Sequence, residues 1–252
     1  MPTSFDGLFW LLAALVVLLF LQRSLHYEIH AVFLIATRNM NITVGAFAFI
    51  FLPGVFLHEL SHWLMAKLLW VRTGSFSLIP QTLPDGRLQL GYVEAAESDI
   101  FRDSLVGAAP LITGILFVAF AAVQRLHLVV MWDVLRHGQW SLFIRGLQSL
   151  PALPDFWLWF YLTFAVSSTM MPSESDRHAF MPLGVVAAVL LALVFVAGAG
   201  PWMVDNLAAP FNDFLRGTAL VLLVSIIVHA LSIVPFMLFH RVLTRLTGLD
   251  VG

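Results

Sequence analysis

The chain contains no cysteine. It therefore has no disulfide, no thiolate ligand and no cysteine nucleophile, so a metal ion would have to be held by histidine and carboxylate side chains. Charged residues are also scarce, at 11% of the 252 residues. The formal net charge is -2 and no basic cluster is present, which argues against a nucleic-acid partner.

Hydrophobic residues, in contrast, make up 60% of the chain, well above their usual share in soluble globular domains. Several apolar segments have the length of a membrane span, and a shorter one begins with an aromatic cluster typical of the headgroup boundary. We predict an all-α polytopic membrane protein with about six transmembrane helices in a single domain, residues 1–252. The predicted spans are Leu8–Leu21, Val44–Trp70, Leu105–Val123, Phe156–Met171, Pro182–Trp202 and Thr218–Phe239.

Polar residues interrupt two of the apolar regions. In Gln22–Ala36, His26, Glu28 and His30 break the apolar pattern, so this segment is the tail of the first helix, an interfacial helix or a re-entrant segment. In Thr218–Phe239, His229 shares one face with Ser225 and Ser232. We predict a hydrogen-bonded packing role for this histidine.

The sequence His-Glu-Leu-Ser-His at positions 58–62 lies inside the apolar segment Val44–Trp70. On an α-helix the i, i+4 spacing places His58 and His62 on one face, one turn apart, as ligands of a single metal ion require. Glu59 is then placed to take a proton from a metal-bound water. Ionisable side chains at membrane depth are expensive unless they are paired, ligated or hydrated, so this pattern indicates a functional site.

Two connecting segments carry further patterns. In Gly74–Ala96, Asp85-Gly86 stands between alternating polar and apolar residues, which predicts a small β-hairpin after the motif helix. Segment Gln124–Pro154 shows no strong period. It is either helical and parallel to the membrane surface, or a plain solvated connector.

A site with two histidines needs at least one more protein ligand and an open position for water. The candidates are Glu174, Asp176 and His178, which follow a proline that should end the segment Phe156–Met171. Between the motif helix and these residues the chain crosses the membrane three times: out in Val44–Trp70, back in Leu105–Val123 and out again in Phe156–Met171. The C-terminal ends of the two helices therefore lie on the same side of the membrane, together with the predicted hairpin.

Three features in this order along the chain resemble a known family. They are the His58–His62 motif in an early helix, the hairpin after it, and the small-residue and proline segment Gly107–Gly114 in the next helix. The chain is similar in these features to the site-2 protease family of intramembrane zinc metalloproteases. In that family an aspartate after an Asn-x-x-Pro stretch supplies the third ligand. Here Thr169-Met170-Met171-Pro172 precedes Asp176 at a different spacing, so the resemblance implies that Asp176 binds the metal.

The motif and the resemblance together predict a zinc-dependent intramembrane endopeptidase. Zinc held by His58, His62 and Asp176 would activate a water and polarise the scissile carbonyl, while Glu59 accepts the proton. Thr169 is a candidate to hydrogen-bond the reacting oxygen, the alternative being a hydroxyl bonded to its own helix. Other classes stay open: a catalytically inactive membrane scaffold or binding protein with a metal-only site, or a divalent-metal transporter.

The expected partners are the lipid bilayer and a transmembrane protein or peptide substrate. A helical substrate must unwind before cleavage, and a strand edge at Leu88, Gln89 and Leu90 would hold it extended. Lys and Arg residues on the side of the metal site outnumber those on the other side by one. This bias, with the resemblance, favours a multi-pass protein of the plasma membrane whose active site lies near the cytoplasmic face.

Overall fold

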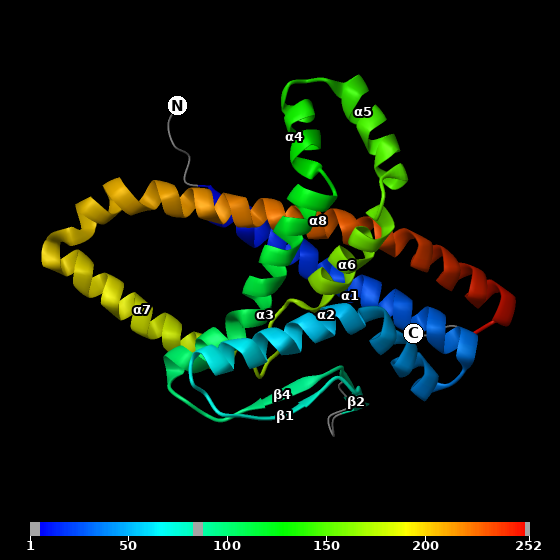
Figure 1. Ribbon diagram of the computed structural model, residues 1–252, viewed down its shortest axis with the longest axis horizontal. Coiled ribbons are helices and arrows are strands. Elements are labelled where there is room, and N and C mark those ends of the chain that lie inside the picture. Colours follow the sequence, from blue (N-terminus) through cyan, green and yellow to red (C-terminus); the bar gives the residue numbers. More distant parts are fainter. Residues whose placement is uncertain (1–5, 83–87, 250–252) are drawn as a thin grey trace.

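The structure is a computed structural model, and it describes residues 6–82 and 88–249. Its helices, in chain order, are α1 (Gly7–Thr37), α2 (Met40–Leu68), α3 (Ile100–Phe120), α4 (Leu128–Arg136), α5 (Trp140–Ser149), α6 (Phe156–Thr169), α7 (Phe180–Val194) and α8 (Gly200–Thr247). Short helical turns at Ala121–Arg125, Leu150–Ala152 and Phe195–Ala199 extend α3, α5 and α7. The strands that follow α2 are β1 (Thr73–Ser77), β2 (Gln81–Thr82), β3 (Leu88–Gln89) and β4 (Tyr92–Ala95) (Figure 1).

Four helical stretches of the described chain are long and apolar enough to cross a membrane, namely Gly7–Thr37, Met40–Leu68, Ile100–Arg125 and Phe180–Thr247. These stretches support a helical membrane protein. Helix α6 has 14 residues, fewer than the roughly 20 that cross a bilayer as a straight helix. The last stretch contains both predicted C-terminal spans. The count of about six crossings therefore stays a prediction.

Helix α1 continues without a break through Gln22–Ala36, so this segment is the tail of the first helix. Two of its polar side chains bond to neighbouring helices. The buried Gln22 amide donates a hydrogen bond to the carbonyl of Ser167 in α6, and Glu28 accepts a 2.7 Å hydrogen bond from Nδ1 of His240 in α8. Because neighbouring helices satisfy these two groups, the helix keeps Gln22 and Glu28 without leaving them unpaired in lipid.

The buried core lies where four of the helices meet. Helices α1 and α8 pack along one another, and α2 and α6 close the other side (Figure 1). The largest cluster of buried hydrophobic side chains consists of Leu25, Ile29, Phe47, Phe51, Val55, Phe164 and Val228. This cluster fixes α2 against α6 one turn before the His58–His62 motif.

Local signals explain where the helices around the motif begin and end. Asn39 caps α2 by accepting hydrogen bonds from the backbone N–H of Asn41 and Ile42, and Asp99 caps α3 in the same way. Helix α6 ends at Thr169, three residues before Pro172, because a proline disfavours helical geometry in the residue before it. The chain after α6 is thereby free to turn back toward α2.

Segment Gly74–Ala96 forms two antiparallel strand pairs that lie along α2 (Figure 1). Strand β1 pairs with β4 through Phe76↔Val93 and Ser77↔Tyr92, and β2 pairs with β3 through Gln81↔Gln89. The predicted Asp85-Gly86 turn lies outside the described residues. The pairing thus brings the two ends of the segment together, as a hairpin requires.

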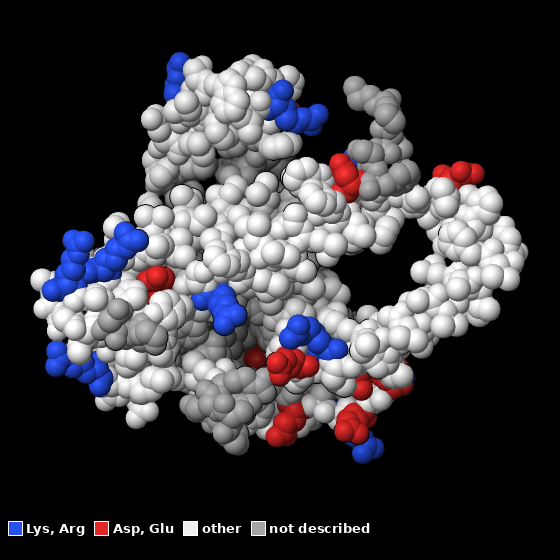
Figure 2. All heavy atoms as spheres, turned by 180° about the vertical axis from the view of Figure 1, so that it is seen from behind, with Lys and Arg blue, Asp and Glu red and all other residues white. Residues whose placement is uncertain are grey.

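Two other parts of the molecule extend away from this core. Helices α4 and α5 form a short helical pair in Gln124–Pro154, and neither contains a buried residue (Figure 1). Helix α7 has no buried residue either, and the chain bends after it at Gly198, whose φ is 87°. The predicted span Pro182–Trp202 is therefore not one straight helix. An opening separates this arm from the rest of the molecule in the space-filling view (Figure 2).

Candidate metal centre

Three side chains from two distant parts of the sequence converge beside α2. The Nε2 atoms of His58 and His62 lie 3.2 Å apart. Asp176, in the segment between α6 and α7, places Oδ1 at 3.3 Å from Nε2 of His62 and Oδ2 at 3.8 Å from Nε2 of His58. Among the described residues this is the one group of three or more such side chains that could hold a metal ion, with ligand atoms within 4.8 Å of one another.

The spacing of these atoms fits a bound metal ion. Tetrahedral ligands at about 2.1 Å from a metal lie about 3.4 Å from one another. The 3.2 Å between the two Nε2 atoms and the 3.3 Å from Nε2 of His62 to Oδ1 of Asp176 are close to that value, and the other carboxylate oxygen lies 3.8 Å from Nε2 of His58. Two imidazole nitrogens and one carboxylate oxygen also form a donor set typical of catalytic metal sites, which keep a further position for water or substrate.

Backbone carbonyls orient both imidazoles toward this point. Nδ1 of His58 donates a 2.7 Å hydrogen bond to the carbonyl of Thr169, and Nδ1 of His62 donates a 2.8 Å hydrogen bond to the carbonyl of Val106. A carbonyl only accepts, so each Nδ1 carries the proton and each neutral ring keeps its Nε2 lone pair free. Such outer hydrogen bonds fix the tautomer and the ring plane of metal-binding histidines.

The Asp176 carboxylate is held by its own turn. The backbone N–H and the hydroxyl of Ser173 each donate a 2.7 Å hydrogen bond to Oδ2. Burial alone would raise the pKa of Asp176, but its contacts with the two imidazoles and the hydrogen bonds from Ser173 outweigh it and hold this pKa well below its usual range. Asp176 is therefore a carboxylate at neutral pH, the form that binds a metal.

Small residues and one hydroxyl on α3 allow the Asp176 turn to approach. A Cβ at Gly107 would overlap the backbone carbonyl oxygen of Asp176, so any larger residue would displace the turn. One helical turn earlier, the hydroxyl of Ser104 donates a 3.0 Å hydrogen bond to the carbonyl of Ala179. Helix α3 thus contacts this segment at two points and carries the Val106 carbonyl between them.

Glu59 lies next to the convergence point. Its side chain is only 7% exposed, and it interacts electrostatically with His58, His62 and Asp176. Gly91, just before β4, contacts Glu59 closely: a Cβ there would be 3.0 Å from the Glu59 Cγ. The carboxylate is therefore enclosed between α2 and the strand segment, close to the three candidate ligands.

The other candidate residues of the Asp176 region lie outside the group. His178 is exposed, and its Nε2 lies 3.8 Å from Asp103 rather than near the two histidines. Glu174 is also exposed and is not one of the three converging side chains. The Thr169 hydroxyl donates to the carbonyls of Ala165 and Val166 in its own helix, so it is the carbonyl of Thr169 that contacts the site.

The residues predicted to bind substrate have structural partners. Leu88 and Leu90 pack against the main hydrophobic cluster. Gln89 pairs with Gln81 across β2 and β3, and its side-chain oxygen accepts a 3.1 Å hydrogen bond from the Gln81 amide. Their role toward substrate stays a prediction, although the segment that follows them reaches Glu59.

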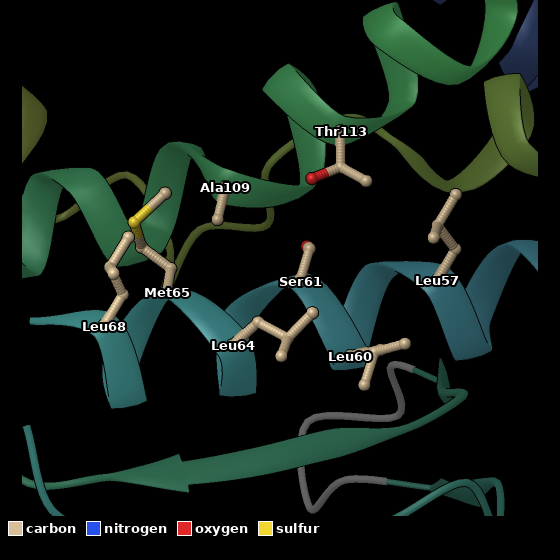
Figure 3. Close-up of a pocket in the computed structure, with 8 residues that line it drawn as sticks. All are labelled: Leu57, Leu60, Ser61, Leu64, Met65, Leu68, Ala109 and Thr113. Atoms are coloured by element: carbon tan, nitrogen blue, oxygen red, sulfur yellow. The ribbon is translucent and has the colours of Figure 1, made fainter.

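A separate apolar pocket of about 160 Å³ lies between α2 and α3. Ser61 and Thr113 face one another across it, and the rest of its lining is leucine, methionine and alanine (Figure 3). Ser61 donates its hydroxyl to the carbonyl of His58. Neither histidine of the motif lines the pocket, so the pocket is distinct from the metal centre.

Sequence reasoning did not find the groups that support the ligands. Val106 contributes only its backbone carbonyl, which accepts a hydrogen bond from His62. Ser173 donates its hydroxyl to the carboxylate of Asp176 in the same turn. A residue pattern carries no signal for a backbone carbonyl that faces another helix. The signal for Gly107 was present, because the small-residue segment Gly107–Gly114 was singled out, but its contact with Asp176 depends on the tertiary structure.

No protein-family model, curated protein or solved structure matches this chain. The motif, the geometry of the three converging side chains and the apolar helices that carry them are therefore the features that bear on function.

Proposed function

We propose that the protein is an intramembrane zinc metalloprotease, as the resemblance to the site-2 protease family implies. The observation that supports this best is the convergence of His58, His62 and Asp176 next to Glu59. A metal site with three protein ligands and an adjacent carboxylate is the arrangement used for hydrolysis rather than for structural metal binding. The apolar helix α2 would place this chemistry within the membrane.

The three candidate ligands would hold zinc through Nε2 of His58, Nε2 of His62 and the carboxylate of Asp176. When bound, zinc supplies Lewis-acid chemistry that lowers the pKa of a water and polarises a carbonyl. Glu59 accepts a proton from the attacking water and returns it to the leaving amine. The carbonyls of Thr169 and Val106 keep both imidazoles in the tautomer that this arrangement needs.

The substrate class follows from the surroundings of the site. A peptide segment in a helix hides its carbonyls in hydrogen bonds, so it must become extended before hydrolysis. The strand segment contacts Glu59 at Gly91, and an extended peptide added to its edge would lie beside this carboxylate. We therefore propose transmembrane or membrane-proximal protein segments as substrates.

The test is a comparison of purified wild-type protein with Glu59→Gln in proteoliposomes that contain a model transmembrane substrate. The amide keeps the side-chain volume but does not accept the proton at neutral pH, so cleavage should fall by about 10²- to 10⁴-fold. Metal content, measured by elemental mass spectrometry, should stay at the wild-type level. Glu97→Gln, a change at an exposed carboxylate between β4 and α3, serves as the matched control and should leave both values unchanged.

Three outcomes would contradict the proposal at different points. Undiminished cleavage by Glu59→Gln would remove this residue from the mechanism. Wild-type protein that binds zinc without cleaving any transmembrane substrate would favour a binding protein with a metal-only site. Zinc uptake into sealed liposomes by the wild-type protein would favour a metal transporter.

A further inference from the structure

A second cavity lies at the end of the α1–α8 pair and shares no residue with the metal centre. Its volume is about 350 Å³. It is lined by Glu28 of α1 and by Met237, His240, Arg241, Thr244 and Arg245 of α8. In the space-filling view, Lys or Arg side chains gather at this end of the molecule, with an acidic side chain beside them (Figure 2). The cavity is thus polar and open at the surface.

The charges that line this cavity favour an anion. Arg241 and Arg245 are one turn apart on the same face of α8 and are both exposed. No described acidic side chain lies within ion-pair distance of either arginine. Glu28 is the one acidic residue of the lining, and its carboxylate already accepts a 2.7 Å hydrogen bond from Nδ1 of His240. Two guanidinium groups therefore remain available to a ligand.

His240 provides an independent observation. Its Nε2 atom is buried and has no hydrogen-bond partner within residues 6–82 and 88–249. A buried polar atom without a partner costs free energy, so such atoms usually bind a ligand, a water or another protein group. Nδ1 is occupied by the Glu28 carboxylate, so Nε2 is the ring nitrogen left for a ligand or a water.

The position of the cavity along α8 indicates where an anion would come from. Residues 218–239 are almost entirely apolar, and the arginine pair follows them directly. A basic pair at the end of an apolar helix lies at the level of the lipid headgroups. Basic pockets between helices at this level bind the phosphates of anionic lipids, and guanidinium groups bind phosphate oxygens in a bidentate manner.

We propose that this cavity binds the phosphate group of an anionic phospholipid, with Arg241 and Arg245 as the donors and the ring of His240 in the lining. The proposal is independent of the hydrolytic function, because none of these residues contacts the metal centre. The Glu28–His240 pair joins α1 to α8 beneath the arginines, so a bound headgroup would also hold the two helices together.

The experiment measures lipid retention and thermal unfolding of the purified full chain in nanodiscs. Wild-type protein in discs of phosphatidylcholine with phosphatidylglycerol should retain phosphatidylglycerol in native mass spectrometry and unfold at a higher temperature than in phosphatidylcholine alone. Arg241→Gln combined with Arg245→Gln should lower the affinity for phosphatidylglycerol by roughly thirtyfold and remove the shift. The matched control, Arg136→Gln with Arg145→Gln in α4 and α5, should behave like wild type.

Other outcomes would overturn the proposal. Stabilisation of the phosphatidylcholine sample by millimolar inorganic phosphate, without retention of lipid, would assign the cavity to free phosphate. An equal loss of thermal stability in both lipids would mean that the arginines only complement the C-terminal dipole of α8. If the double variant does not fold, Arg245→Gln alone, a change at an exposed side chain, should still weaken retention, and unchanged retention would contradict the assignment.

Discussion

Two pairs of histidines lie inside the helical part of this molecule, and their ring nitrogens are used differently. In the pair on α2, Nδ1 of His58 and of His62 bonds to a backbone carbonyl, and both Nε2 atoms face the Asp176 carboxylate. In the pair formed by His26 of α1 and His229 of α8, no carboxylate is shared. His229 uses Nδ1 on the carbonyl of Ser225 and Nε2 on the hydroxyl of Ser168.

In the second pair, His229 is packed rather than arranged for a ligand. His229 is fully buried, and both of its nitrogens are occupied by hydrogen bonds. The ring of His26 lies edge-on against Phe47 and Phe51 of α2. The comparison indicates that burial of histidine in a membrane protein does not by itself define a metal site. Free lone pairs must converge, and a carboxylate must be within reach.

The largest difference between the two pairs should appear in metal content. His58→Gln removes a converging Nε2 atom, so the purified protein should lose most of its metal. The same replacement at His229 should leave metal content at the wild-type level, because neither nitrogen of that ring is available. Elemental mass spectrometry after dialysis against zinc measures both. Equal losses in the two variants would break the comparison, since they would show that either histidine supports the site.

The next largest effect should distinguish Asp176 from Glu174 as the third metal ligand beside His58 and His62. Asp176→Ala should lower metal content and activity together, because a site with two histidines binds far more weakly than one with three ligands. Glu174→Ala, at an exposed position two residues earlier, should retain most of the metal. Isothermal titration of the metal-free variants with zinc gives the affinities. A loss at Glu174 with full binding by the Asp176 variant would transfer the third ligand to Glu174.

A smaller effect is expected from a change that touches no ligand. Gly107→Ala would press a Cβ against the Asp176 carbonyl and shift the turn that carries the carboxylate. We expect zinc affinity to fall by about 10- to 100-fold, the usual range for residues that support ligands. Gly45→Ala is the matched control, because a Cβ at Gly45 meets no atom within 4 Å. Unchanged zinc affinity in Gly107→Ala would show that the turn tolerates displacement.

The smallest effect belongs to the second pair. Ser168→Ala removes the 2.9 Å hydrogen bond to Nε2 of His229. Interhelical hydrogen bonds in membrane proteins contribute about 0.6 kcal/mol on average, so the free energy of unfolding should fall by roughly that amount. Metal content should not change. Reversible unfolding in mixed micelles measures the first value, and a loss of metal would show that the packed pair influences the metal centre.

Local patterns in the sequence predicted a helical membrane protein and three of the four residues of its candidate site, His58, Glu59 and His62. The apolar segments predicted helices long enough to cross a membrane, and four helical stretches of the described residues have that length and composition. The i, i+4 spacing placed His58 and His62 on one face of a single helix, because both residues belong to the same regular element. The polar face of His229 likewise predicted a hydrogen-bonded packing role, which agrees with its bonds to Ser225 and Ser168.

Only the tertiary structure decided which groups lie against the face of α2 that carries His58 and His62. Asp176, rather than Glu174 or His178, approaches the histidines because the turn after α6 contacts α3 at Gly107. The continuation of α1 through Gln22–Ala36 likewise depends on partners in α6 and α8. Backbone carbonyls such as that of Val106 are the same in every residue. Their role is therefore set by how the helices cross, and no local pattern records it.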